Sequence, residues 1–439
     1  MEIQECKKYR ILIAPEVEDL AETHRMTSFA KAFKKLGHEV IVLGKGRYDY
    51  LFADEGFQRV YIDYDEEWMD DEKFRMMHTL DKYGWDFVTE SELKKFVQLE
   101  VKLLTELKPA VVITGFRPTM SISTKLVEIP LVWVLSAVCS DMYYKNGLAT
   151  PLMQPNEKTS ELEIFPQKHN SLITTKNDFL PYKFSSWNKV MKEMKLDNFS
   201  SAVNIVRGDF NLMSDAPELF PEFQDIPPYY GFCGPILMEH NIDLPDSIKK
   251  YKKVSGRPII FFAMGSSGNP EIFKSIIAGF KDQPYDVFAA LTNIISKEEI
   301  PYIPSNVVVE KFYPAFEVTV MADVAVIHGG QGTVYTTAMA GTPFVGIPMF
   351  LEQQHNLENL ARKGCGIVLS RYNFSSEALN QSINQILNNK EFKVNSSKVQ
   401  NQIIKYKTDE NFYSPMIGAK QVIKFLNNKE DSYFKVNAL

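Results

Sequence analysis

Residues 322–333 read ADVAVIHGGQGT, an apolar run followed by a glycine-rich turn. The uninterrupted run predicts a strand that is buried on both faces of a parallel sheet. A helix is then expected from Gln331 to Ala340, and Gly341 is suited to end it. The first N–H groups of such a helix have no partner inside it, and the helix dipole adds positive charge there. The junction therefore predicts an anion site at the carboxyl end of a parallel strand, where such sheets bind ligands.

The side chains of this junction suit a phosphate group. Gly329, Gly330 and Gly332 carry no side chain, so a phosphate can approach the backbone closely. Thr333 can add a hydroxyl donor, and His328 can direct a ring N–H at the same anion. A tight turn that needs glycine for its backbone alone would have the same composition, so the motif needs support from elsewhere in the chain.

That support comes from two further strand ends in the same half of the chain. The next strand is followed by PMFLEQQHN, residues 348–356, in which acidic and amide groups suit adjacent sugar hydroxyls: Glu352, Gln353 and Asn356. The first strand of this half ends in GSSG, residues 265–268, whose small and donor-rich residues suit a second approach to phosphate: Gly265, Ser266 and Ser267. Three polar strand ends in one domain are hard to explain by packing alone.

Strand and helix patterns alternate along the chain in two successive runs. The first contains the apolar segments RILIAP, HEVIVLG, AVVITG and IPLVWVL, and the second contains PIIFFAM, YDVFAAL, NVVVEKF, DVAVIH and PFVGIP. Two such runs predict an α/β protein with two Rossmann-like, doubly wound domains and a cleft between them. We place the N-terminal domain at residues 1–235 and the C-terminal domain, with a terminal helix, at residues 236–439. Residues 141–198 lack clean periodicity and are interpreted either as helices and loops over a binding face or as a plain surface excursion.

Composition excludes several other classes of protein. The 439 residues carry a net charge of −6 without a strongly basic half, which argues against nucleic acid as the main partner. Four cysteines without a CxxC pair indicate reduced thiols in a cytosolic protein, and the seven histidines form no metal-spaced cluster. There is no apolar stretch typical of a signal peptide or membrane span. We expect a cytoplasmic protein without a metal site, and leave open peripheral contact with the inner face of a membrane.

The segment VAVIHGGQGTVYTTAMAGTPFVGIPMFLEQQHNLENLARKGCGIVL, residues 324–369, closely resembles the donor-site signature of GT-B glycosyltransferases. The nearest groups are the family 1 enzymes, which glycosylate small molecules, and the family 28-like enzymes. The resemblance implies inverting transfer of a hexose from a UDP- or dTDP-linked sugar, with neither a catalytic metal nor another cofactor. It implies that residues 328–333 hold the diphosphate and that Glu352 and Gln353 hold the sugar. The acceptor domain resembles the family more loosely, and its acceptor is expected to be a small molecule or a lipid.

Two departures from the family pattern concern the nucleobase and the catalytic base. Phe312 and Tyr313 stand where the family packs its nucleobase, but Ala315 replaces a common glutamine. Alignment on GHEV, residues 37–40, places Ala21 and Glu22 where many members have Gly-His, and His24 follows two residues later. Removal of the acceptor proton requires a histidine or a carboxylate within hydrogen-bond reach. Glu22 can replace the histidine, His24 can reach the same place, or the base lies elsewhere.

Other readings of the sequence stay open at this point. A glycosyltransferase-like auxiliary protein that has lost its base fits the Ala21-Glu22 departure. A nucleotide-sugar epimerase has a similar architecture but would not be expected to combine HGGQGT with the later EQ pair. Arg117, in the strand-end segment TGFRP, is interpreted as a structural ion pair in preference to a contact with an acidic acceptor.

Overall fold

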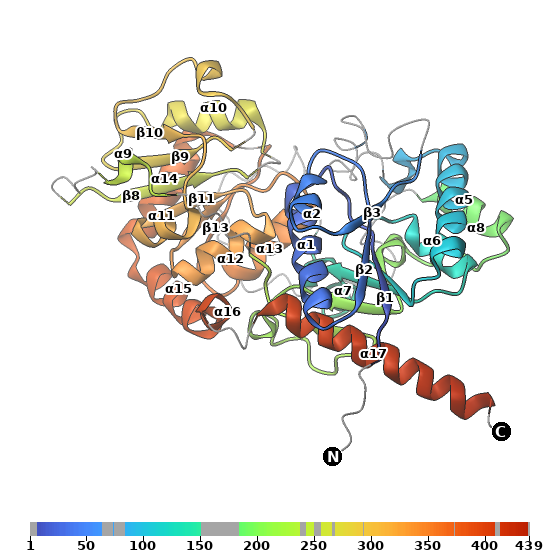
Figure 1. The fold of residues 1–439 in the computed structure, drawn as a ribbon. Coiled ribbons are helices and arrows are strands. Elements are labelled where there is room, and N and C mark those ends of the chain that lie inside the picture. The colour runs from blue at the N-terminus through green and yellow to red at the C-terminus, as the bar shows by residue number, and fades with distance from the viewer. Residues whose placement is uncertain are drawn as a thin grey trace.

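The protein consists of two α/β domains that lie side by side (Figure 1). The computed structural model describes residues 7–63, 73, 84–150, 184–237, 243–249, 256–265, 268–292, 294–372, 374–408 and 413–437. The sequence predictions for Ser266, Ser267 and most of the segment 141–198 lie outside these residues.

The first domain is built on a seven-stranded parallel sheet with the order β3-β2-β1-β4-β5-β6-β7. Its strands are β1 (Arg10–Ile13), β2 (Glu39–Leu43), β3 (Gln58–Val60), β4 (Val111–Thr114), β5 (Leu131–Leu135), β6 (Phe210–Met213) and β7 (Tyr230–Phe232). Strand β1 pairs with both β2 and β4, so that Ile11 lies opposite Val40 on one side and Val111 on the other. The strand order runs outward in one direction from β1 and in the other direction from β4, although the two strands are parallel. Such a switch point creates a ligand-binding crevice at the carboxyl ends of the two strands.

Helices cover both faces of this first sheet. They are α1 (Leu20–Lys35), α2 (Tyr50–Asp54), α5 (Glu90–Leu107), α6 (Met120–Leu126), α7 (Asp141–Lys145) and α8 (Ser185–Glu193). Asp19 caps the start of α1 by accepting a hydrogen bond from Glu22 N at 2.8 Å, which fixes where the helix begins. Phe29 and Phe33 on α1 pack against one face of the sheet, and Leu104 on α5 packs against the other.

The second domain has a six-stranded parallel sheet with the order β10-β9-β8-β11-β12-β13. Its strands are β8 (Ile259–Ala263), β9 (Asp286–Ala290), β10 (Val307–Glu310), β11 (Val324–Ile327), β12 (Phe344–Gly346) and β13 (Gly366–Val368). Its helices are α9 (Asp246–Lys249), α10 (Pro270–Gly279), α11 (Ala315–Met321), α12 (Gln331–Ala340), α13 (Leu351–Ala361), α14 (Ser376–Asn388), α15 (Lys390–Ile403) and α16 (Lys405–Thr408). The equivalent switch point lies between β8 and β11.

The last helix, α17 (Ser414–Asn437), packs on the first domain and corrects the domain assignment made from sequence. Ala419, Val422 and Leu426 are buried in the same core cluster as strands β1, β2, β4, β5 and β6. Gln421 Nε2 donates to the carbonyl of Phe232 on β7 at 2.7 Å. Residues 414–437 therefore belong structurally with the first domain, and Figure 1 shows this helix, in red, beneath it.

The two domains also share a packed apolar cluster. It joins Val138 and Phe220 of the first domain to Val334 and Leu357 of the second. None of the helices within the described ranges is both long enough and apolar enough to span a membrane.

Candidate active site

The two switch points face a single cavity between the domains. Its volume is about 510 Å³, and its walls include residues that follow β1 and β4 in one domain and β8 and β11 in the other. Ligand-binding crevices of two doubly wound sheets are therefore combined in one site.

The glycine-rich junction adopts the predicted strand–turn–helix geometry. β11 ends at Ile327, α12 runs from Gln331 to Ala340, and Gly341 follows in the left-handed conformation with φ of 63°. Gly330 is the N-cap residue of α12 and, because it is a glycine, makes no side-chain cap bond. His328, Gly330, Gln331, Gly332 and Thr333 all line the cavity. The N–H groups at this helix start are thus placed beside the space where an anion can bind.

Gly329 and Gly332 each lack a side chain, but for different structural reasons. Gly329 has φ of 95°, and a Cβ there would lie 2.5 Å from the carbonyl oxygen of Gln353. Gly332 has no heavy atom within 4 Å of the position a Cβ would take. Gly329 is required by backbone conformation and close packing, whereas the absence of a side chain at Gly332 leaves open space at the cavity wall.

His328 is held between the two phosphate-loop candidates. The residue is 4% exposed, and a Cβ at Gly265 or Gly330 would lie 2.5 or 2.6 Å from its Nε2 atom. Burial lowers the pKa of His328 to about 4, so the ring is neutral near pH 7. A neutral imidazole can still donate one hydrogen bond to an anion, but it supplies no positive charge.

The three polar residues after β12 have different positions. Glu352 lines the cavity, and its Oε1 atom lies 3.5 Å from Asn356 Nδ2. Burial raises the pKa of Glu352 above its ordinary value, with Arg25 acting in the opposite direction. The side chain of Gln353 accepts a hydrogen bond from Met349 N at 2.9 Å, although the residue also contributes to the cavity wall.

Asn356 lies behind the cavity wall and connects several of its segments. It is buried, and its Nδ2 atom donates to the carbonyl of Gly329 at 3.1 Å. Its Oδ1 atom accepts from Ser136 Oγ of the first domain at 3.3 Å. Asn356 is not among the residues that line the cavity, so this geometry gives it a supporting position behind the junction.

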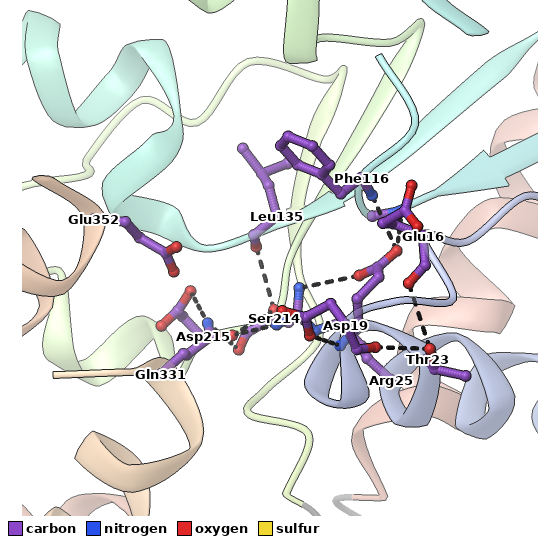
Figure 2. Close-up of polar contacts among 12 residues, drawn as sticks. Glu16, Asp19, Thr23, Arg25, Phe116, Leu135, Ser214, Asp215, Gln331 and Glu352 are labelled. Atoms are coloured by element: carbon purple, nitrogen blue, oxygen red, sulfur yellow. Dashed lines mark hydrogen bonds and ion pairs between the residues drawn. The ribbon is translucent and has the colours of Figure 1, made fainter. Parts of the chain in front are cut away.

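The side chain of Gln331 connects the two domains. Its Nε2 atom donates to Ser214 O at 3.0 Å and to Asp215 Oδ2 at 2.9 Å, and its Oε1 atom accepts from Arg25 Nη2 at 3.1 Å (Figure 2). Asp215 also accepts from Tyr335 Oη at 2.8 Å, one turn further along α12. The helix start that offers its backbone to the cavity is therefore anchored to the first domain by its own side chains.

Asp215 was not identified from the sequence. It follows β6, a strand that the apolar pattern did not reveal, and it also accepts a hydrogen bond from Ala137 N at 2.7 Å. Burial raises the pKa of Asp215, and its hydrogen bonds to Ala137, Tyr335 and Gln331 act in the opposite direction. The sequence feature that could have identified Asp215 is the polar pair Ser214-Asp215 directly after a strand.

The residues expected to pack the nucleobase both reach the cavity. Phe312 and Tyr313 follow β10, and Ala315 begins α11 beside them. Tyr313 is largely part of the core, because its ring meets Phe261 edge-on and its hydroxyl donates to Val308 O at 3.2 Å. Phe312 is thus the more available of the two rings for a planar base.

Glu22 lies on the opposite wall of the cavity. Its Oε1 atom accepts hydrogen bonds from the backbone N–H groups of Gly115 and Phe116, both at 2.9 Å, in the loop after β4. The residue is 5% exposed. Burial raises the pKa of Glu22 from its ordinary value of 4.5 to about 7, while Arg25 and the two N–H groups act to lower it.

His24 lies on the same helix as Glu22 but does not line the cavity. Its backbone carbonyl accepts a hydrogen bond from Ser28 Oγ at 3.0 Å. The structure thus brings Glu22, and not His24, to the wall that faces the donor helix.

Arg117 forms the structural ion pair that the sequence favoured. Its Nε atom lies 2.9 Å from Glu100 Oε1, and both residues are buried at 4% and 0% exposure. Thr119 and Ser123 also donate hydrogen bonds to this carboxylate. The interpretation of Arg117 as an ion-pair residue is confirmed.

The rest of the first-domain wall is largely apolar. Trp85, Phe116, Trp133, Leu135 and Val206 all line the cavity there. This wall offers apolar and aromatic contact area, with Glu22 at its polar edge.

The chain has two facing Rossmann-like domains, and a helix start suited to phosphate lies at their interface. This is the fold of the GT-B glycosyltransferases, so the fold expected from the sequence is confirmed. Within that class, the model for UDP-glucoronosyl and UDP-glucosyl transferase matches residues 11–405, and the chain belongs to this family. The protein is therefore a glycosyltransferase of the family 1 type.

Curated relatives are similar over most of their length. A PGL/p-HBAD biosynthesis glycosyltransferase from Mycobacterium tuberculosis is 24% identical over 313 residues, which is 70% of each chain. A PGL/p-HBAD biosynthesis rhamnosyltransferase from Mycobacterium bovis is 23% identical over 395 residues, covering 88% of this chain and 83% of the relative.

Solved structures share the fold at low sequence identity. The calicheamicin glycosyltransferase CalG4 superposes with a TM-score of 0.64 at 15% identity, covering 96% of this chain and 99% of its own. The glycosyltransferase VinC, solved in complex with dTDP, gives a TM-score of 0.61 at 17% identity, covering 95% of this chain and all of its own.

Proposed function

We propose that the chain is an inverting, metal-independent glycosyltransferase that moves a hexose from a UDP- or dTDP-linked sugar to a hydroxyl of a small, largely apolar acceptor or a lipid. One observation carries the proposal. A single cavity has the start of α12 on one wall and the buried carboxylate Glu22 on the other. A diphosphate leaving group and a proton acceptor can thus occupy opposite sides of one sugar.

The donor half supports binding of the diphosphate at residues 328–333. The N–H groups at the α12 start and the helix dipole stabilise negative charge that grows on the leaving diphosphate. Fixed dipoles of this kind can serve in place of a divalent cation. Gly332 leaves room for the phosphates, and Glu352 is placed to accept hydrogen bonds from sugar hydroxyls.

The acidic groups of the cavity are compatible with an anionic donor. Burial raises the pKa of both Glu22 and Glu352, so the protonated fraction of each is larger near neutral pH than for an exposed glutamate. The smaller average negative charge on Glu22 and Glu352 reduces their electrostatic repulsion of the diphosphate.

The acceptor half supports Glu22 as the general base. Its Oε1 atom is occupied by two backbone N–H groups, which fixes the carboxylate and leaves Oε2 as the proton acceptor. A pKa of about 7 is close to the optimum for a general base at neutral pH. His24 is the weaker alternative because it does not line the cavity.

The expected reaction is a single displacement at the anomeric carbon. The acceptor hydroxyl transfers its proton to Glu22 while its oxygen attacks the anomeric carbon. The bond from that carbon to the diphosphate oxygen breaks, and the electron pair leaves with the nucleoside diphosphate at α12. Attack from the side opposite the leaving group inverts the anomeric configuration.

The apolar first-domain wall supports an acceptor with aromatic or aliphatic surface. The structural neighbour SpnG is complexed with spinosyn aglycone, and we propose that this chain likewise takes an aglycone as its acceptor. The reactive hydroxyl would lie at the Glu22 end of the wall.

The proposal is tested by screening nucleotide sugars and acceptors together. We expect at least one UDP- or dTDP-sugar to raise the melting temperature, because a ligand that binds the folded state stabilises it. With an apolar phenol or alcohol present, free nucleoside diphosphate should accumulate in EDTA, and the product should carry the inverted anomeric configuration by NMR.

Three results would contradict parts of this proposal. Donor binding without nucleotide release for any acceptor would favour the auxiliary protein. Interconversion of two nucleotide sugars without an acceptor would identify an epimerase. A product with retained configuration would refute the single displacement.

A further inference from the structure

One basic side chain stands among the acidic groups of the cavity. Among the cavity-lining residues in the described ranges, Arg25 is the only lysine or arginine. The acidic residues that line the same space are Glu16, Asp19, Glu22 and Glu352. The Arg25 side chain is 17% exposed, so its charge is only partly screened by water.

Arg25 contacts the two functional walls at the same time. Its Nη1 atom lies 3.7 Å from Glu22 Oε2, one helical turn back on α1. Its Nη2 atom donates to Gln331 Oε1 at 3.1 Å, on the first residue of α12. One guanidinium thus reaches both Glu22 of the first domain and the donor helix of the second. Figure 2 shows Arg25 beside Gln331.

The orientation of Gln331 is fixed independently of Arg25. Its amide nitrogen donates to Ser214 O and to Asp215 Oδ2, which can only accept. The amide oxygen must therefore face away from Asp215, and it accepts hydrogen bonds from Arg25 Nη2 at 3.1 Å and from Ser214 Oγ at 3.3 Å. Because the amide cannot rotate without losing both donated bonds, the donor helix offers a fixed acceptor to the guanidinium.

We propose that Arg25 is a positioning residue that joins the base Glu22 to the first residue of the donor helix α12. This inference rests on the proposed function in assigning Glu22 as the base. The two contacts orient the Oε2 side of the carboxylate relative to the helix start, and they favour the ionised form of the base when the domains are in contact. Arg25 needs no direct contact with the donor for this role.

The direction of the effect follows from the charges that face Glu22. Burial and the charge of Asp19, the N-cap residue of α1, disfavour the ionised form of Glu22, whereas Arg25 and the N–H groups of Gly115 and Phe116 favour it. Arg25 also favours the ionised forms of Glu352 and Asp215, the other acidic groups near it. Removal of Arg25 leaves the acidic groups uncompensated, so the base should ionise only at higher pH.

The test compares Arg25→Met, Arg25→Lys, Gln331→Met and the double variant Arg25→Met/Gln331→Met. Arg10→Met is the matched control, because Arg10 pairs with Glu39 in an exposed position and does not line the cavity. The readouts are kcat and kcat/KM against pH, and donor affinity measured by calorimetry with UDP and dTDP.

The expected result separates positioning from binding. Arg25→Met should move the acid limb of kcat/KM to higher pH by about half a unit or more. It should also lower kcat at pH 7 by about tenfold, with nucleotide affinity changed less than about threefold. Arg25→Lys should keep the acid limb nearer its original position but recover kcat only in part, because an ammonium is a point charge without the planar fork that reaches two partners. The losses of kcat in Arg25→Met and Gln331→Met should not multiply in the double variant.

Other outcomes would overturn the inference. A loss of nucleotide affinity greater than about tenfold with an unchanged acid limb would mean that Arg25 binds the diphosphate itself. Unchanged kinetics per folded molecule, together with a lowered melting temperature, would leave Arg25 a purely structural role. Fully multiplicative losses in the double variant would show that Arg25 does not act through Gln331.

A second measurement does not depend on activity. The unfolding free energy is measured against pH for the chain with Glu22 and for the Glu22→Gln variant. The difference between the two curves reports the titration of Glu22. Its midpoint should be higher in the Arg25→Met background than in the wild-type background. An unchanged midpoint would refute the link between Arg25 and Glu22. If this midpoint moves while no acceptor is ever glycosylated, the proposed function fails and the electrostatic link stands.

Discussion

Glu22→Gln is expected to remove transfer activity and, at alkaline pH, to stabilise the folded protein. Glutamine keeps an oxygen that can accept from Gly115 N and Phe116 N, so the two short contacts of Oε1 can persist. It cannot take a proton from an acceptor. The substitution therefore changes the charge of a buried group while its shape stays nearly the same.

The size of the stability effect follows from the pKa of Glu22. Folding raises this pKa from 4.5 to about 7. A tenfold change in an acid dissociation constant corresponds to about 1.4 kcal/mol, so ionisation of the buried carboxyl costs the folded state roughly 3 kcal/mol. Between the two pKa values the unfolded chain has lost a proton that the folded chain retains, so the free energy of unfolding falls as pH rises. Glu22→Gln removes this fall, and its advantage should be absent near pH 4.5 and complete above pH 7.

Two assays check the prediction on the same preparations. Denaturant titrations at several pH values should show a stability difference that grows from pH 5 to pH 8 and approaches roughly 3 kcal/mol. Initial rates of nucleoside diphosphate release should fall by about 10²- to 10⁴-fold, the usual contribution of a general base. A stability difference that is independent of pH would refute the assigned burial of the carboxylate. Activity within a few-fold of the wild type would refute its role as the base.

Three further substitutions test other parts of the structure. Gly332→Val should raise the donor KM by about tenfold or more with little change in melting temperature, because its side chain enters open space at the cavity wall. Arg117→Met should lower the free energy of unfolding by about 3–5 kcal/mol, because it leaves the charge of Glu100 buried and unpaired. Tyr335→Phe should cost about 1–3 kcal/mol, because Asp215 loses a buried donor. Steady-state kinetics check the first, and denaturant titrations check the other two.

Each of these predictions has a control and a contrary outcome. Arg10→Ala, which breaks the exposed pair with Glu39, should change stability by no more than about 1 kcal/mol. An equally small effect of Arg117→Met would mean that water or other donors compensate Glu100 in the variant. An unchanged donor KM for Gly332→Val would place the donor elsewhere. For Tyr335→Phe, unchanged stability would show that Asp215 finds another donor.

The sequence predicted the strands that are continuous apolar runs. VAVI, IIFFA and LVWVL are buried on every residue and have few polar interruptions, so their pattern is unambiguous. The β6 strand, FNLM, was missed because Asn211 interrupts it. The structure shows why the asparagine is tolerated there, since its side chain bonds to Gly208 N at 3.0 Å and to the carbonyls of Gly208 and Tyr229.

The position of α17 could not be predicted from local pattern. Its residues are amphipathic, which predicts a helix with one buried face but does not identify the sheet that it covers. That choice depends on contacts such as Tyr9 Oη donating to Asn427 Oδ1 at 2.6 Å, across nearly the whole length of the chain. A boundary drawn from sequence order therefore assigns the helix to the wrong domain.

The candidate site was predicted better for backbone groups than for side chains. A glycine-rich strand–helix junction determines where N–H groups point, because the strand end and helix start are local features. The partners of Gln331 and Asn356 depend on Ser214, Asp215 and Ser136 in the other domain. Sequence spacing contains no information on such pairs, so two residues expected at the donor also serve the interface between domains.

The proposed role of Glu22 as the base depends on the charges around it in the cavity. A buried histidine tends to be neutral, as His328 is, and it gains a positive charge when it accepts a proton. A buried glutamate at this position must be kept ionised to act as a base, and burial alone opposes that. The chain supplies two N–H donors from the loop after β4 and one guanidinium from α1, and the guanidinium is shared with the donor helix. Under the proposed function, ionisation of Glu22 is therefore linked to the contact between domains, because Arg25 contacts both Glu22 and Gln331 of the donor helix.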